Sequence, residues 1–334
     1  EVERGLVGSE MGIRDRSRSK AGASNTSQCP AVKERKGMDI SCAYRWLTSP
    51  KQALAIAVSF VIAYWVWELA VPVAWNPVRP FLFLSYQVPE SQVLLSKASE
   101  RLYGPAPTYS ADNALLTSLR SFCQNLHNWL FPNDPPLLRY GKGWMDLCFW
   151  LYYIVVFSFL RQFLTMQVFR PLAIHWGIRG TNKIARFTEQ GYALFYWGLA
   201  GMIGVYVMSF QDSWWYNLDH LWYQYPHWQL RWELKLYYLL QASYWTQQAL
   251  VMLLGLERPR KDYYELVAHH LVTLWLIGWS YFINLTMIGT TVFVCMDIPD
   301  TYLALSKLLN YLHMNTAASV CFASFMVIWT YVAE

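Results

Sequence analysis

Long apolar stretches alternate with shorter polar segments along most of the chain. A helix that spans a membrane needs about 20 mostly apolar residues. Seven stretches come close to that length, and they cover residues 52–72, 144–167, 190–210, 234–254, 264–283, 287–306 and 316–332. Only helices and closed barrels satisfy their backbone hydrogen bonds in lipid. The pattern therefore predicts an all-α fold, a polytopic membrane bundle of about seven spans.

The composition indicates a membrane protein rather than a soluble one. Of the 334 residues, 55% are hydrophobic and 15% are charged, whereas an average soluble domain carries about 25% charged residues. The 18 Trp and 23 Tyr are typical of the aromatic belts at the two surfaces of a bilayer. The chain is therefore depleted in the residues that a water-facing surface needs.

Three regions follow from this pattern. Residues 1–50 are polar, rich in Ser, Lys and Arg, and lack the apolar core of a signal peptide, so we predict a disordered basic tail. Residues 51–143 hold the first span and a Pro-rich segment, and residues 144–334 hold the other spans. The net charge of +5 comes largely from the tail. Basic flanks beside a span are normally topology signals or contacts with anionic lipid, and we expect no nucleic-acid partner.

Clusters of Lys and Arg predict the orientation of the spans. They precede the first span and recur in every second connection, which places these connections and the N-terminus in the cytosol. The cations of the two later clusters are Arg170, Arg179, Lys183, Arg186, Arg258, Arg260 and Lys261. The opposite connections, 73–143 and 211–233, then face a lumen. In the first of them, Ser110 and Asp112 precede a predicted surface helix that begins near Ala114.

Four ionisable residues interrupt two successive apolar stretches. His269 and His270 lie in the fifth stretch, and Asp297 and Asp300 lie in the sixth. Ionisable groups are costly in lipid and usually mark a functional site. Counted from the cytosolic ends at about 1.5 Å per residue, His269 lies about 12 Å deep and the aspartates about 10 and 15 Å deep. Antiparallel neighbours would therefore bring all four residues to one depth, which predicts a single site.

The spacing of the four residues refines this prediction. Asp297 and Asp300 are three residues apart and share a helical face, and the proline between them frees a backbone carbonyl. His269 and His270 diverge by about 100°, so we expect one to react and the other to pack. We favour His269 as the reactive residue, because Glu265 precedes it by one helical turn and could hold it in place.

A histidine that is oriented by a carboxylate acts as a general base or a nucleophile. Histidine and carboxylate also bind iron or zinc, but membrane di-iron enzymes need clustered histidine pairs, and the five other histidines here are dispersed. The six cysteines show no zinc spacing, so we expect no metal and no cofactor. Two alternatives stay open: histidines that only pack, and a lipid or ion carrier, which lacks the repeated broken helices of many transporters.

The residues around the four ionisable groups resemble the longevity-assurance motif of eukaryotic ceramide synthases, above all of the fungal branch. The similar runs are His269-His270-Leu271-Val272-Thr273-Leu274, Trp279-Ser280-Tyr281, Met296-Asp297-Ile298-Pro299-Asp300 and Leu305-Ser306-Lys307-Leu308-Leu309-Asn310-Tyr311. Supporting stretches are Phe83-Leu84-Ser85-Tyr86 and Tyr244-Trp245-Thr246-Gln247-Gln248. The similarity extends over residues 50–330.

This resemblance implies a multi-pass enzyme of the endoplasmic reticulum that N-acylates a sphingoid base. It implies a TLC-type catalytic bundle in residues 144–334, eight spans in the family, and fatty acyl-CoA as co-substrate rather than a cofactor. The implied catalytic residues are His269, His270, Asp297 and Asp300. Membrane lipid, a small single-span accessory subunit and a second copy of the chain are the other implied partners.

The resemblance also suggests candidate substrate-binding residues. Tyr244, Trp245 and Gln248 belong to a supporting stretch, and Glu265 lies beside the histidines. Acyl-CoA is cytosolic, so its CoA head is expected against the cytosolic cations Lys183, Arg186, Arg258, Arg260 and Lys261.

The two ends of the chain depart from the family pattern. Members continue past the run that corresponds to Trp329-Thr330-Tyr331 with a further span, whereas this sequence stops at Glu334 and begins at Glu1 rather than Met. We therefore expect a C-terminally truncated piece of a longer protein. The alternative function is that of a non-catalytic TLC-domain lipid sensor or trafficking factor. The intact His-His and Asp-x-x-Asp sets favour the enzyme.

Overall fold

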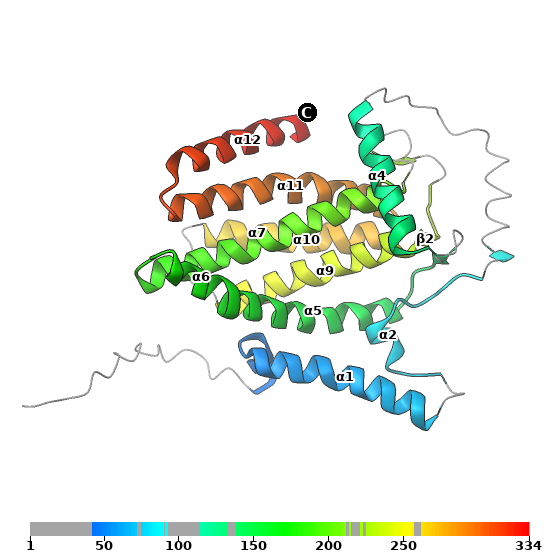
Figure 1. Ribbon diagram of the computed structural model, residues 1–334. Coiled ribbons are helices and arrows are strands. Elements are labelled where there is room, and N and C mark those ends of the chain that lie inside the picture. Colours follow the sequence, from blue (N-terminus) through cyan, green and yellow to red (C-terminus); the bar gives the residue numbers. More distant parts are fainter. Residues whose placement is uncertain are drawn as a thin grey trace, which may run out of the picture. The chain divides into compact units, whose positions relative to one another are not determined.

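The computed structural model describes residues 42–71, 75–89, 91–92, 114–132, 138–211, 214, 221–222, 225–256 and 262–333 (Figure 1). The predicted basic tail up to Ser41 lies outside these residues. So do the predicted capping residues Ser110 and Asp112, and the cations Arg258, Arg260 and Lys261.

The described residues are mostly helical, as predicted. After a 3₁₀ turn at Cys42–Leu47, the elements are α1 Pro50–Ala70, α2 Arg79–Leu82, α4 Ala114–Leu130, β1 Arg139–Tyr140, α5 Met145–Phe163, a π-helical turn Leu164–Phe169, α6 Arg170–His175, α7 Thr181–Met208, β2 Leu230–Arg231, α9 Trp232–Leu253, α10 Tyr263–Phe282, α11 Thr286–Tyr311 and α12 Asn315–Ala333. The strands β1 and β2 form a single short antiparallel pair among the described residues. Each of the seven predicted stretches overlaps a long helix.

Long helices pack side by side in this part of the chain (Figure 1). The helix α9 contacts α5, α10, α7 and α11, and α11 also packs along α7 and α12. The helix α1 packs on α5. The main hydrophobic cluster surrounds α9, where Tyr237, Tyr238 and Tyr244 meet Tyr192 and Tyr196 of α7. The core is therefore aromatic, and α9 carries many of its side chains.

Three helices are long and apolar enough to cross a membrane by length and composition: Pro50–Ala70, Met145–His175 and Thr181–Met208. The chain therefore has the composition of a multi-span membrane protein. The helix α7 begins nine residues before the predicted stretch 190–210, and α11 extends five residues beyond 287–306. Polar residues such as Lys183 and Lys307 occupy these extensions, so the hydrophobic pattern underestimates the length of both helices.

The helical segment Met145–His175 changes its winding in the middle. The π-helical turn Leu164–Phe169 joins α5 to α6. Pro171 follows directly and lacks the N–H group that would continue the regular α-helical ladder. Such π-helical turns are frequent at functional sites, and Thr165 of this turn lines the pocket described below.

Gly204 allows α7 to approach α11 closely. A Cβ atom at Gly204 would lie 2.5 Å from Cγ2 of Val294 and 2.7 Å from the hydroxyl oxygen of Tyr237. At Gly201 it would lie 3.8 Å from Cβ of Asp297. Small residues at helix interfaces let the two backbones come close. Gly204 therefore allows the close approach of α7 to the α11 segment that carries the aspartates, whereas a Cβ atom at Gly201 would make only ordinary contacts.

A buried ion pair links α9 to α5. The ammonium of Lys235, with its side chain 0% exposed, lies 2.6 Å from Oδ1 of Asp146. It also donates to the carbonyl oxygens of Ser85 and Gly141, at 2.9 and 2.7 Å. The hydroxyl of Tyr281 on α10 donates to Oδ2 of Asp146 at 2.8 Å. Buried charges need such partners, so this set joins three helices and the segment around Ser85.

A second lysine extends this set. The ammonium of Lys142 donates to the carbonyl oxygen of Tyr281 at 2.9 Å and to Oδ1 of Asn284 at 3.0 Å. Burial and the ammonium of Lys235 lower the pKa of Lys142, the carboxylate of Asp146 raises it, and the net pKa is about 8. Ser85 of the supporting stretch Phe83–Tyr86 thus belongs to this set of partners, which does not include the two histidines.

We predict that Gly204→Ala destabilises the protein. The added methyl group would collide with Val294 and Tyr237, and overpacking of this kind costs about 1–3 kcal/mol. The matched control is Gly198→Ala, because a Cβ there meets Cγ2 of Thr301 at an ordinary 3.6 Å. Thermal unfolding in detergent should show a lower midpoint for Gly204→Ala alone. Equal midpoints for the two variants would contradict the close packing.

We predict that Lys235→Met destabilises the protein more strongly. Removing one partner leaves the buried Asp146 carboxylate without its cation, which typically costs about 3–5 kcal/mol. The double variant Lys235→Met with Asp146→Asn should recover part of this loss. Lys51→Met, at an exposed position of α1, is the control. If both lysine variants unfold at the same temperature in detergent, the ion pair does not hold the bundle.

Candidate active site

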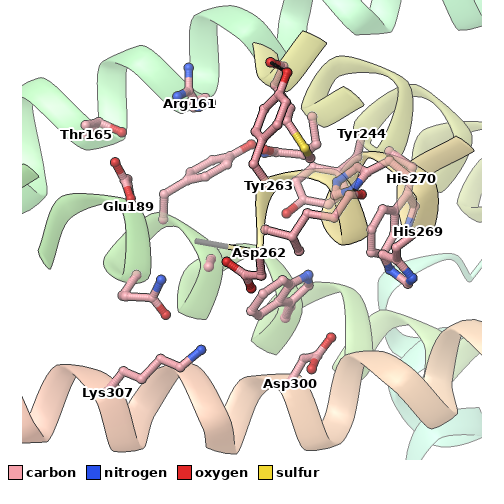
Figure 2. Close-up of a pocket in the computed structure, with 18 residues that line it drawn as sticks. Arg161, Thr165, Glu189, Tyr244, Asp262, Tyr263, His269, His270, Asp300 and Lys307 are labelled. Carbon is pink, nitrogen blue, oxygen red and sulfur yellow. Dashed lines mark hydrogen bonds between the residues drawn. The ribbon is translucent and has the colours of Figure 1, made fainter. Parts of the chain in front are cut away.

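A pocket of about 370 Å³ lies among α5, α7, α9, α10 and α11 (Figure 2). Its walls combine aromatic rings, carboxylates, cations and histidines. The lining residues are Arg161, Thr165, Glu189, Gln190, Tyr192, Ala193, Trp197, Tyr244, Trp245, Gln248, Met252, Asp262, Tyr263, Leu266, His269, His270, Asp300 and Lys307. Three of the four predicted catalytic residues therefore line one pocket.

The two histidines come from α10 and lie against one aromatic ring. The ring of Trp245 lies 5.9 Å from that of His269 and 5.5 Å from that of His270, centroid to centroid, in edge-on contacts. The histidine rings lie 5.6 Å apart at 89°. Adjacent helical residues diverge by about 100°, and here that divergence leaves both side chains in the lining.

The backbone determines which nitrogen of His270 carries the proton. Nδ1 of His270 lies 2.8 Å from the carbonyl oxygen of Leu266. A carbonyl oxygen only accepts hydrogen bonds, so Nδ1 is the donor and the neutral ring holds its lone pair on Nε2. This is the tautomer that a general base needs at Nε2. His269 is more exposed than His270.

The two aspartates occupy different environments. Asp300 is half-buried and lines the pocket (Figure 2), and Lys307 lies on the same helix. Asp297 is 1% exposed and receives a hydrogen bond of 2.6 Å from the amide of Gln241. Positions three apart on a helix differ by about 60° in direction. That difference is enough to place Asp300 in the pocket wall and Asp297 in the core behind it.

Among the described residues, two cations that were not predicted as site residues line the pocket, and the predicted Arg258, Arg260 and Lys261 lie outside the described residues. Arg161 of α5 and Lys307 of α11 line it from different helices (Figure 2). Lys183 and Arg186 lie outside this lining, and Arg186 donates to Glu189 at 2.9 Å. Arg161 and Lys307 sit inside apolar stretches or at their ends, so the cation clusters of the connections gave no sign of them.

Three of the candidate substrate-binding residues on α9 and α10 line the pocket, and Glu265 does not. Tyr244, Trp245 and Gln248 all line the pocket. Glu265 is exposed on α10 and lies outside the lining. Gln241 was not predicted, although the repeat Tyr237, Gln241, Tyr244, Gln248 places polar groups along one face of α9. That stripe within an apolar helix is the signal that could have identified it.

The described residues contain no group of three His, Cys, Asp or Glu side chains that could hold a metal ion. The lining instead offers a histidine with an oriented lone pair, a carboxylate, two cations and large apolar rings. Such a set can accept a proton, hold a cation beside a carboxylate and enclose an aliphatic chain.

Known proteins are similar to this chain in the part that contains the pocket residues of α9, α10 and α11. Residues 186–332 match the TLC domain. The chain is 44% identical over 193 residues to a sphingosine N-acyltransferase, lac1, of Schizosaccharomyces pombe, covering 58% of this chain and 50% of that protein. It is 41% identical over 192 residues to the ceramide synthase LAG1 of Saccharomyces cerevisiae, covering 58% and 46%.

A mammalian relative is more distant. Ceramide synthase 4 of Bos taurus is 34% identical over 146 residues, which cover 44% of this chain and 36% of that protein. The matched parts span about half the length of the fungal relatives. The TLC match at residues 186–332 includes α9, α10 and α11, and with them His269, His270, Asp297 and Asp300.

Proposed function

We propose that this chain acts as a ceramide synthase, an acyltransferase that moves a fatty acyl group from acyl-CoA to the amine of a sphingoid base. One observation carries the proposal. His269, His270 and Asp300 line a single pocket within the region that is similar to fungal sphingosine N-acyltransferases. The aromatic wall formed by Tyr244 and Trp245 suits the aliphatic chains of both substrates.

The reaction requires two protons to leave the nitrogen of the sphingoid ammonium. The first is lost to solvent before attack, and the second leaves as the amide forms and ends on the CoA thiol. The sphingoid ammonium loses a proton, its nitrogen attacks the thioester carbonyl carbon, and a C–N bond forms while the C–S bond breaks. The CoA thiolate leaves and takes up a proton. A histidine can accept the proton from the amine and return it to the thiolate. A covalent acyl-imidazole formed on a histidine is the other route.

We assign the base to His270 rather than to the sequence-favoured His269. Its Nδ1 donates to the carbonyl of Leu266, so the lone pair is on Nε2. The expectation for His269 depended on Glu265, which is exposed and outside the pocket lining. His269 then packs against Trp245 at the pocket wall, and Asp300 holds the incoming ammonium.

We place the CoA head at the end of the pocket that carries cations. Arg161 and Lys307 line it, and Asp262 marks the start of α10 at the same pocket. Arginine and lysine are the usual partners of phosphate groups. Arg258, Arg260 and Lys261 precede α10 directly in the sequence and are proposed to extend this cationic end.

We further propose the membrane arrangement that the charge pattern predicts. The long helices α1, α5, α7, α9, α10, α11 and α12 would be seven spans of an endoplasmic-reticulum protein with a cytosolic N-terminus. Residues 144–334 would form the catalytic bundle, and the tail 1–50 and the segment 51–143 would precede it in the chain. A small single-span accessory subunit and dimerisation stay proposals that derive from the family resemblance.

The direct test is an acyl-transfer assay. The chain is expressed in microsomes that lack their own ceramide synthases and supplied with acyl-CoA and dihydrosphingosine, and ceramide is measured by mass spectrometry. We expect ceramide to form only when both substrates are present. Binding of dihydrosphingosine without any amide product would support the lipid-sensor alternative, and the proposed activity would be wrong.

Substitutions at His270 test the assignment of the base. His270→Asn keeps a donor near the Nδ1 position but removes the Nε2 lone pair, so the protein should fold and ceramide formation should fall about a thousandfold. His269→Asn should cost less, because that ring has a packing role in this assignment. Size-exclusion profiles in detergent report folding. A larger loss of ceramide formation for His269→Asn would show that His269, not His270, is the base.

A further inference from the structure

We propose that Gln241 is a positioning residue of this site: it holds one oxygen of Asp297 so that the other receives a hydroxyl group of the sphingoid base, next to the ammonium that Asp300 holds. The inference rests on the proposed function and adds a residue that neither the family motif nor the charge pattern identifies. It rests on three hydrogen bonds, one unpartnered atom and one stacked ring pair.

The amide of Gln241 makes three hydrogen bonds inside the bundle. Gln241 is 1% exposed. Its Nε2 donates to Oδ2 of Asp297 at 2.6 Å and to the hydroxyl oxygen of Tyr237 at 3.0 Å. Its Oε1 accepts from the hydroxyl of Tyr196 at 2.8 Å. A carboxylate only accepts hydrogen bonds, so this set of partners allows one orientation of the amide.

The second oxygen of Asp297 lacks a donor. Oδ1 is buried and has no hydrogen-bond partner among the described residues. A buried acceptor without a donor is unfavourable, and such an atom in a native structure calls for a partner such as a bound molecule. The substrate of the proposed reaction brings suitable donors, the hydroxyl groups next to the ammonium that Asp300 holds. Oδ2 is already occupied by Gln241, so Oδ1 is the oxygen that remains for them.

The same network reaches the pocket wall. The rings of Tyr196 and Tyr244 are stacked, with centroids 3.3 Å apart and planes at 8°. Tyr244 lines the pocket, and so does Asp300, one helical turn after Asp297. The hydrogen bonds of Gln241 therefore connect α7, α9 and α11 directly behind the wall. Positioning within about an ångström matters for transfer rates, and losing it typically costs about a hundredfold.

The main variant is Gln241→Leu, which keeps the volume and removes both hydrogen-bonding groups. We expect kcat/KM for dihydrosphingosine to fall about a hundredfold, whereas KM for acyl-CoA stays unchanged. Tyr196→Phe is the finer variant, because it keeps the stacked ring and removes the hydroxyl that holds Oε1. It should show a smaller loss of the same kind.

The matched control is Gln162→Leu. Gln162 is also a buried glutamine, 8% exposed, but it donates to the carbonyl oxygens of Trp46 and Leu47 in the 3₁₀ turn before α1. We expect it to lower the unfolding temperature with unchanged kcat and KM. If Gln241→Leu behaves like Gln162→Leu, the role of Gln241 is structural and the inference is wrong.

An exchanged pair separates positioning from chemistry. In Gln241→Glu with Asp297→Asn, the amide and the carboxyl change places and the hydrogen bond between α9 and α11 can form in reverse. We expect the unfolding temperature to recover towards the wild type while kcat/KM for dihydrosphingosine stays low, because the carboxylate has left position 297. Recovery of both quantities would overturn the inference.

A binding readout keeps this inference distinct from the proposed activity. Dihydrosphingosine should raise the unfolding temperature of the wild type, because a ligand stabilises the state that binds it. The shift should be lost in Gln241→Leu and kept in Gln162→Leu. If the wild type forms no ceramide but shows this pattern, the proposed activity fails and the inference stands. If dihydrosphingosine stabilises all three proteins equally, the inference fails.

Discussion

Two polar side chains buried along α9, Lys235 and Gln241, find their partners on other helices, and these contacts hold the bundle in one arrangement. An apolar interior offers no water to replace a missing hydrogen bond. Lys235 therefore pairs with Asp146 of α5 and with two backbone carbonyls, and Gln241 pairs with Asp297 of α11 and Tyr196 of α7. These directional contacts fix the rotation and height of α9 against three neighbours. Hydrophobic packing alone is non-directional and would leave the rotation and the height of α9 less well defined.

The pocket follows from that arrangement together with the close approach of α7 and α11. Gly204 lets α7 lie close against the segment of α11 that carries the aspartates. In this position Asp297 lies in the core, where Gln241 reaches it, and Asp300 lies in the pocket wall. The histidines arrive from α10, which contacts both α9 and α11. One rotation of α11 thus gives two identical side chains different surroundings and, in our proposal, different tasks.

Much of the fold could be predicted from the hydrophobic pattern, because a helix of spanning length leaves an apolar stretch that is hard to miss. All seven stretches overlap helices, and the helix near Ala114 is present as α4. His269, His270, Asp300, Tyr244, Trp245 and Gln248 were predicted as site residues and share one pocket. Arg161, Lys307 and Gln241 were missed, since a polar residue in an apolar helix shows no direction in the sequence alone. Glu265 was expected beside His269 from its one-turn spacing, but that spacing does not say which way α10 faces.

The sequence by itself determined which segments are helical, that the chain is built for a membrane, and which ionisable residues lie within its apolar stretches. These properties are local, since they depend on the length and polarity of single segments. Only the tertiary structure decided which helices are neighbours, which aspartate reaches the pocket and which nitrogen of His270 holds the lone pair. Those outcomes depend on the rotation of each helix about its axis. That rotation is set by contacts between residues far apart in the chain, such as Lys235 with Asp146 and Gln241 with Asp297.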